Sequence, residues 1–298
     1  MTRFTNILAV VQKQEDALPV LTRARALRNG HNGTTGIHVL RVVHEGIADL
    51  PSRFINASAE LKQFVLAAEE SALEDDLAAT SVDLAGTESA TIWNRRTWEG
   101  IVHTAEAIGA DLVIKRSGTT GAAVASLRTP DDWNLLRHVN RPVLMTHGET
   151  WMTSPTVLAA VDPFDEEHIE INERVLRTAV AFAEQTSAAL HIVSVYPPLS
   201  RWAANLQPLQ SYERLKNDVA HDVQNRINTL AASLRITHYT VHAAEGQAEA
   251  AIQSTLNQIA GNLLVIGTKA RKDIGGVLLG NTSERVLSLL KADVLTVP

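Results

Sequence analysis

Four apolar segments in the first half of the chain recur in the second half at nearly the same spacing. With offsets between 150 and 153 residues, segments 7–12, 37–43, 112–115 and 143–145 match 157–162, 190–196, 264–267 and 294–296. Four matches at one spacing indicate a tandem repeat, which restricts the chain to two copies of one fold. The polar stretch 147–155, which contains Gly148 and Pro155, is typical of a linker. We therefore expect one domain at 1–147 and another at 154–298.

Within each half, short apolar segments alternate with longer segments of helical periodicity. The predicted helices cover 15–28, 57–79 and 98–108 in the first half, and 167–184, 211–234 and 247–259 in the second. Further strands are predicted to end near 91–93 and to lie at 239–242. Strands that alternate with helices predict an α/β fold with a parallel sheet and helices on both faces. Such sheets bind ligands at the carboxyl ends of their strands, where the strand order reverses.

Composition excludes several classes of function. The net charge of -6 argues against a nucleic-acid partner. Because the chain contains no cysteine, disulfides and thiolate metal sites are excluded. The N-terminal residues lack the layout of a signal peptide, and no apolar stretch approaches the roughly 20 residues that span a bilayer. We expect a soluble, cytoplasmic protein with no membrane partner.

The stretch 263–284 has the order of a phosphate-binding loop. An apolar run ends at Gly267, a basic loop follows, and a helix is predicted to start at Asn281 with Glu284 three residues later. A strand, a glycine loop and a helix N-terminus together direct main-chain N–H groups and a helix dipole toward an anion. An ordinary loop between strand and helix, with glycines that serve only turns, explains the same residues.

These motifs, in this order, resemble the universal stress proteins, and in particular their tandem-domain type. The resemblance covers essentially the whole chain. It rests on Asp162 after the first strand of the second half, on the strand end 265–268 (Val-Ile-Gly-Thr), on 278–286 (Leu-Leu-Gly-Asn-Thr-Ser-Glu-Arg-Val) and on 129–137 in the first half. It implies two tandem Rossmann-like (adenine nucleotide alpha hydrolase-like) domains, each a five-stranded parallel sheet with helices on both faces.

The nucleotide-binding branch of this family carries Gly-x2-Gly-x9-Gly followed by Ser or Thr. The present chain keeps the first and last glycines, Gly267 and Gly280, but has Ala270 at the middle position and Asn281 in place of Ser or Thr. If the middle position requires a positive φ, Ala270 costs roughly 1 kcal/mol or more. Asn281 is a milder change, because its amide still donates to an oxygen.

By this resemblance, the second half would hold ATP or AMP, with Mg²⁺ carried by the nucleotide. Asp162 would contact adenine or ribose, and the main chain between Val193 and Val195 would meet the adenine. Lys269 and Arg271 would be charge partners of the nucleotide. The phosphates would be held by Gly267, Gly280, Asn281, Thr282 and Ser283, and the further nucleotide-binding candidates are Ile266 and Ala270.

The first half departs from the pattern and is expected to bind no nucleotide. Its first strand ends in Gln12 rather than Asp, Lys115 replaces the first glycine, Gly118 takes the middle position, and Arg128 replaces the last glycine. The next helix is predicted to start with Thr129 as N-cap, Pro130 at the first position, and Asp131 and Asp132 in the first turn, where carboxylates repel phosphate. Exposed anchors for a different ligand in this half would be Lys115, Arg116 and Arg128.

No catalytic or metal-binding constellation is evident. The chain has no Gly-x-Ser-x-Gly elbow and no Walker-type Lys-Ser/Thr pair, so we expect negligible ATP hydrolysis. His238 and His242 share a strand face but lie about 13 Å apart by strand rise, too far to bind one ion. His103 and Glu99 are expected to be a solvated helix pair, and the equivalent His38 and His191 to pack within their own halves. We expect no catalytic and no metal site.

Three functions remain open on this evidence: a nucleotide-sensing stress protein, a nucleotide-free scaffold or chaperone-like interaction protein, and, least favoured, a slow ATPase. The resemblance also implies that the halves pair as an intramolecular pseudo-dimer through 143–145 and 294–296, and that a homodimer is possible.

Overall fold

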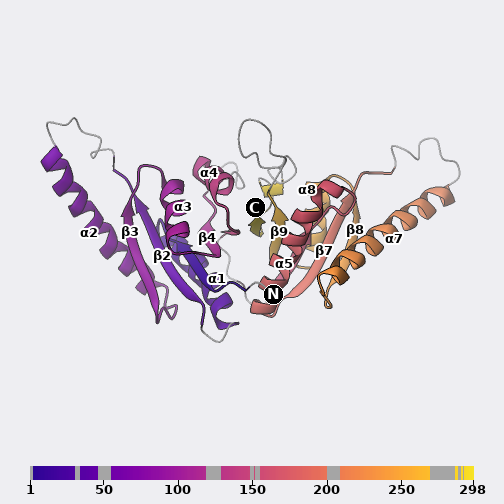
Figure 1. The fold of residues 1–298 in the computed structure, drawn as a ribbon, viewed down its shortest axis with the longest axis horizontal. Helices are drawn as coiled ribbons and strands as arrows, with labels where there is room; N and C mark the ends of the chain where they lie inside the picture. Colours follow the sequence, from indigo (N-terminus) through magenta and orange to yellow (C-terminus); the bar gives the residue numbers. More distant parts are fainter. Residues whose placement is uncertain are drawn as a thin grey trace. The chain divides into compact units, whose positions relative to one another are not determined.

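The computed structural model of the chain describes residues 3–30, 34–45, 55–118, 129–147, 151, 155–199, 209–268, 286–287, 290 and 292–298. The chain divides into two compact units, one formed by Phe4–Thr150 and one that contains Trp151–Pro298. Each unit alternates strands with helices, as the tandem repeat predicts (Figure 1). No helix in the described part of the chain is long and apolar enough to cross a membrane.

The first half is a five-stranded sheet with the order β3-β2-β1-β4-β5, and every adjacent pair is parallel. Helices α1 and α2 contact each other on one face, and α3 and α4 contact each other on the opposite face (Figure 1). The elements are β1 (Asn6–Val10), α1 (Gln14–Asn29), β2 (Gly36–Val43), α2 (Ile55–Ala79), β3 (Thr87–Trp93), α3 (Thr97–Ala107), β4 (Leu112–Arg116), α4 (Pro130–His138) and β5 (Val143–Thr146).

The second half repeats this topology with the strand order β8-β7-β6-β9-β10, again with parallel pairs. Residues 286–287 are helical, in the place that corresponds to α4. The other elements are β6 (Thr156–Ala160), the 3-10 helix η3 (Glu166–His168), α5 (Ile169–Thr186), β7 (Ala189–Tyr196), α7 (Leu209–Ser233), β8 (Thr240–Glu245), α8 (Ala248–Gln258), β9 (Leu263–Gly267) and β10 (Asp293–Val297).

The central strands carry the core of each half. Residues 7–10 of β1 and 157–159 of β6 are fully buried, because helices cover both faces of a parallel sheet and leave no polar side. The near-continuous apolar runs in the sequence have this origin. The predicted α/β fold, with two tandem parallel sheets, is therefore confirmed.

The element boundaries differ from the predictions at the sheet edges. β3 begins at Thr87, although its large apolar residues, Ile92 and Trp93, lie only at its end, since residues 88–90 face solvent. β8 extends to Glu245. β6 ends at Ala160, so Asp162 lies two residues beyond the strand. Before α5, the Asp165 carboxylate accepts a hydrogen bond from Glu167 N–H (2.9 Å) and starts a 3-10 turn.

Candidate functional site

The strand order of each half reverses at its first strand. β1 lies between β2 and β4, and β6 lies between β7 and β9. Loops that leave neighbouring strands in opposite directions open a crevice at their carboxyl ends, where α/β proteins bind ligands. Gln12 follows β1 and Asp162 follows β6 at these two equivalent positions.

In the second half, the Asp162 carboxylate turns toward its own loop. One oxygen accepts a hydrogen bond from the Phe164 N–H (3.2 Å), and the other lies 3.3 Å from His168 Nδ1. The side chain of Asn172 in α5 bonds to both main-chain groups of Asp162, at 3.0 and 2.6 Å. These contacts fix the position of Asp162, yet its side chain stays 53% exposed and so remains accessible to a ligand.

Val195 lies on β7 beyond the last residue that pairs with β6. The carbonyl of Val193 accepts a hydrogen bond from Val161 N–H (3.0 Å), so Val193 directs its main-chain groups toward β6. Because the main-chain groups of every second residue in a strand point toward the same neighbouring strand, the N–H and C=O of Val195 point to the side of β6 as well. No residue within the described ranges hydrogen-bonds to these two groups. The crevice therefore offers one donor and one acceptor beside the segment that carries Asp162.

Gly267, the last residue of β9, has a structural reason to be glycine. A Cβ atom at this position would overlap Cγ1 of Ile171 and lie 3.0 Å from its Cδ1. The glycine thus allows α5 to pack closely against β9. Ile266 and Val193, two further candidates, are buried in the strands behind the crevice.

Seven predicted site residues lie outside the described residues, so the structure does not show whether they meet Asp162 and Gly267. They are Lys269, Ala270, Arg271, Gly280, Asn281, Thr282 and Ser283. Their role stays a prediction.

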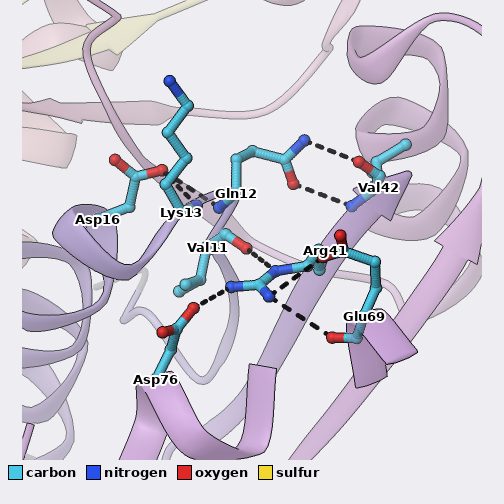
Figure 2. A network of polar contacts seen from close by, with 8 residues as sticks. All are labelled: Val11, Gln12, Lys13, Asp16, Arg41, Val42, Glu69 and Asp76. Carbon is cyan, nitrogen blue, oxygen red and sulfur yellow. Dashed lines mark hydrogen bonds and ion pairs between the residues drawn. The ribbon is translucent and has the colours of Figure 1, made fainter. Parts of the chain in front are cut away.

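In the first half, the side chain of Gln12 occupies the main-chain groups that are equivalent to those of Val195. The Gln12 amide oxygen accepts from Val42 N–H (2.9 Å), and its NH₂ group donates to the Val42 carbonyl (3.0 Å). Strand register establishes the equivalence, because Val11 N–H donates to Leu40 as Val161 N–H donates to Val193. Figure 2 shows Gln12 pointing at Val42.

Arg41 ties the same strand end to α2. Its buried guanidinium donates to the Val11 carbonyl (3.2 Å) and forms ion pairs with Glu69 and Asp76, both on α2 (Figure 2). Two carboxylates and a carbonyl offset the cost of burying this charge. Ionic contacts therefore hold the end of β2 to α2 in the first half.

The Asp132 carboxylate accepts the hydrogen bonds at the start of α4, where a phosphate would be expected from the family resemblance. It is fully buried at the start of α4, where one oxygen accepts from Lys115 Nζ (2.7 Å) and the other from the N–H groups of Gly118 and Thr129 (both 3.0 Å). Thr129 in return accepts from Asp132 N–H, and Pro130 holds the first helical position, as predicted. An internal carboxylate thus takes the donors that a bound phosphate would need.

Strand register corrects one alignment made from the sequence. Ile114 pairs with Ala9, and Val265 pairs with the equivalent Ala159, so Arg116 and not Lys115 corresponds to Gly267. The one-residue shift also moves Gly118 out of register with Ala270. The residues before the loop, 112–114 and 263–266, are all apolar, so the sequence pattern could not fix the register.

The prediction that Lys115 and Arg116 are exposed anchors is also wrong. The Lys115 side chain is only 12% exposed and is paired with Asp132. Arg116 pairs with Glu15 (2.7 Å) and Asp16 (3.4 Å) of α1. Internal carboxylates neutralise both charges. Arg128 lies outside the described residues.

Comparison with known proteins identifies the family. Residues 3–147 and 154–298 each match the model of the universal stress protein family. The chain belongs to the universal stress protein family. The family predicted from the sequence is therefore confirmed.

Curated relatives within the family match along their whole length. The chain is 26% identical to Universal stress protein E homolog of Haemophilus influenzae, with 98% of this chain and 97% of that protein covered. It is 24% identical to Universal stress protein E of Escherichia coli, with 100% and 95% covered. The tandem arrangement is therefore shared with these universal stress proteins.

Solved structures show the same fold. A functionally unknown protein from Pseudomonas aeruginosa PAO1 is 26% identical with a TM-score of 0.67, and the match covers 99% of this chain and 92% of that chain. A universal stress protein from Archaeoglobus fulgidus DSM 4304 is 17% identical with a TM-score of 0.62, and 99% of both chains are covered.

Two histidines of the second half lie together in a way the sequence did not reveal. His191 Nδ1 on β7 lies 2.9 Å from His242 Nε2 on β8. Burial lowers the pKa of His191, and burial together with the neighbouring His191 lowers the pKa of His242. No group of three possible metal ligands occurs among the residues described. His38, equivalent to His191, pairs with Glu88 (3.2 Å) in the first half.

Sequence reasoning missed the Gln12–Val42 and His191–His242 contacts for the same reason. Both join neighbouring strands that are about 30 and 50 residues apart in the chain, and local periodicity carries no signal for such pairs. The register of β7 against β8 brings the histidines together. His191 pairs with Thr240, so His242 lies diagonally across from it on the same face.

Asp132→Ala tests the internal anion of the first half. The substitution leaves the nearly buried Lys115 ammonium and the N–H groups of Gly118 and Thr129 without their carboxylate, so the free energy of unfolding of this half should fall by about 3 kcal/mol. Chemical denaturation of the full chain measures the change. The neighbouring Asp131→Ala variant is the control and should lose less than about 1 kcal/mol. Equal losses in both variants would contradict this assignment.

The histidine pair predicts a pH dependence of stability in the second half. Since the pKa of both histidines is lowered in the folded state, the unfolded chain takes up protons first as pH falls through about 6.5. The free energy of unfolding should therefore decrease between about pH 7.5 and pH 5.5. His242→Gln should reduce this decrease, and exposed His238→Gln should not. Denaturation midpoints at both pH values measure this decrease. A decrease in His242→Gln as large as in the wild-type chain would contradict the prediction.

Proposed function

We propose that the second half binds an adenine nucleotide, ATP or AMP, and that occupancy of this site sets the state in which the protein acts. Membership of the universal stress protein family assigns the chain to the stress response. Binding, rather than turnover, is the proposed mode of action.

The main-chain pair of Val195 carries this proposal. Its N–H and C=O face the crevice and have no partner in the described part of the chain. Val195 is only partly buried, and main-chain groups that the fold leaves without a partner bond to water or to a ligand, so a ligand that supplies an acceptor beside a donor fits there. The edge of adenine has a ring nitrogen acceptor next to an amino donor. The exposed Asp162 carboxylate adds an acceptor for a ribose hydroxyl.

The phosphate part of the proposal rests on the predicted loop 267–283. Its main-chain N–H groups, the predicted helix start at Asn281, and the cations Lys269 and Arg271 favour an anion. Mg²⁺ would be held by the phosphates of ATP. Because Ala270 replaces a glycine, we expect affinities that are micromolar or weaker.

The first half is proposed to bind no nucleotide. Gln12 supplies the two hydrogen bonds that the base would make, and Asp132 supplies the negative charge that the phosphate would bring. A nucleotide would have to displace both side chains and gain little in return. This half is then a structural partner of the second, and the predicted pairing through 143–145 and 294–296 remains a proposal.

Two other functions would explain some of the same features. A nucleotide-free scaffold would use the family fold alone, and a slow ATPase would need a base that activates water, which the sequence does not provide. We expect hydrolysis well below about one ATP per minute, and a magnesium-dependent rate that survives removal of contaminating ATPases would overturn this. The cytoplasmic location remains a proposal.

Calorimetric titration of the full chain with AMP and ATP tests the site. Ala270→Gly should tighten binding, because glycine restores the residue that the nucleotide-binding motif carries and adopts a positive φ without the cost of a Cβ atom. Gly280→Val should abolish binding, since a branched side chain blocks the approach of phosphate to the main chain. Asp162→Asn should weaken binding about tenfold through the loss of a charged acceptor.

Asp165→Asn is the matched control for Asp162. It changes an acidic residue three positions away that caps η3, and it should leave nucleotide affinity unchanged. Equal affinities in the wild-type chain and all four variants would place the nucleotide elsewhere. Absence of heat with either nucleotide, confirmed by equilibrium dialysis, would favour the scaffold.

A further inference from the structure

The end of β2 in the first half has the same main-chain geometry as the proposed base position of the second half. Val42 and Val195 are equivalent in register, and each directs an N–H and a C=O toward the end of its central strand. At Val42 both groups are occupied, and the occupant is a side chain rather than another strand.

A carboxamide offers the same pair of hydrogen-bonding groups as the ligand edge that fits the N–H and C=O of Val42. It presents a carbonyl acceptor beside an NH₂ donor, as the edge of adenine presents a ring nitrogen beside an amino group. The Gln12 carboxamide uses both, at 2.9 and 3.0 Å. Among the described residues, these two hydrogen bonds are the only ones that the side chain makes.

The main chain around Val42 is held by contacts that do not involve the Gln12 side chain. Asp16 accepts hydrogen bonds from the main-chain N–H groups of Gln12 (3.2 Å) and Lys13 (3.1 Å). Arg41 holds β2 to α2 and to the Val11 carbonyl (Figure 2). Removal of the carboxamide should therefore expose the main-chain groups of Val42 without rearranging them.

The electrostatics of the first half restrict the ligand to a neutral one. Asp132 already occupies the donors at the start of α4, and it neutralises Lys115. A phosphate directed at the start of α4 would meet this buried carboxylate. A nucleoside fits the position, and a nucleotide gains nothing from its charge.

We propose that Val42 is a latent nucleobase-recognition position and that Gln12 is its internal occupant. The residue that follows the first strand, Gln12 or Asp162, thus decides whether a half accepts a base. The comparison with Val195 rests on the function proposed above. The occupancy of Val42 by Gln12 stands independently of it.

Amide-resolved NMR of the full chain tests the proposal, with Val42 and Val195 as reporters of the two halves. In Gln12→Ala, hydrogen exchange at Val42 should accelerate about fivefold, the effect of losing one hydrogen bond of about 1 kcal/mol. Gln63→Ala, which truncates an exposed glutamine on α2, should leave this exchange unchanged. Gln12→Asp, which copies the second half, is the second variant if alanine unfolds the chain.

Adenosine and AMP are then titrated into each protein. In the wild-type chain neither ligand should shift Val42, whereas in the Gln12 variants adenosine should shift it and AMP should bind there no more tightly. Unchanged exchange at Val42, or no adenosine-dependent shift in either Gln12 variant, overturns the proposal. If the ligands shift the Val42 amide signal in the Gln12 variants but do not shift the Val195 signal, only the proposed function of the second half is contradicted.

Discussion

The second strand of each half is longer than the first, so the main-chain groups at its end extend past the neighbouring strand. These groups need hydrogen-bond partners from elsewhere, and the proposed ligand position depends on this need. β2 and β7 have eight residues each, whereas β1 and β6 have five. Beyond the shorter strand, main-chain N–H and C=O groups lose their ladder partners and need others. The two halves meet this requirement in different ways. The first uses the Gln12 side chain, whereas in the second no described residue bonds to the main-chain groups of Val195, which we propose accept a ligand.

Charge follows the same division between the halves. The first half holds α2 to β2 through buried Arg41, and it starts α4 around the buried Asp132–Lys115 pair. At the position of Arg41 the second half has Ser194, and α7 contacts β8 through the Tyr212 hydroxyl, which donates to Glu245 (3.0 Å). Buried pairs contribute little net stability but are costly to break. The first half thus pairs these two cations with its own carboxylates, which supports the proposal that it binds no nucleotide.

The fold was predictable from the sequence because its signals are local and repeated. Apolar runs such as 7–10 and 157–159 mark the buried strands, and Thr129-Pro130 marks a helix start. The site was predictable only in part. The position of Asp162 follows from topology, but the occupancy of Val42 depends on which rotamer Gln12 adopts across two strands. The alignment of Arg116 with Gly267 required strand pairing, because uniformly apolar segments do not specify register.

The central claim is that one crevice of the chain is open to a base and the other is closed from within. Native mass spectrometry of the full chain with increasing AMP measures this most directly, because it counts bound ligands without a model of affinity. The account predicts that binding saturates at one AMP per chain. Saturation at two AMP per chain would show that Gln12 and Asp132 do not close the first half, and would contradict the account.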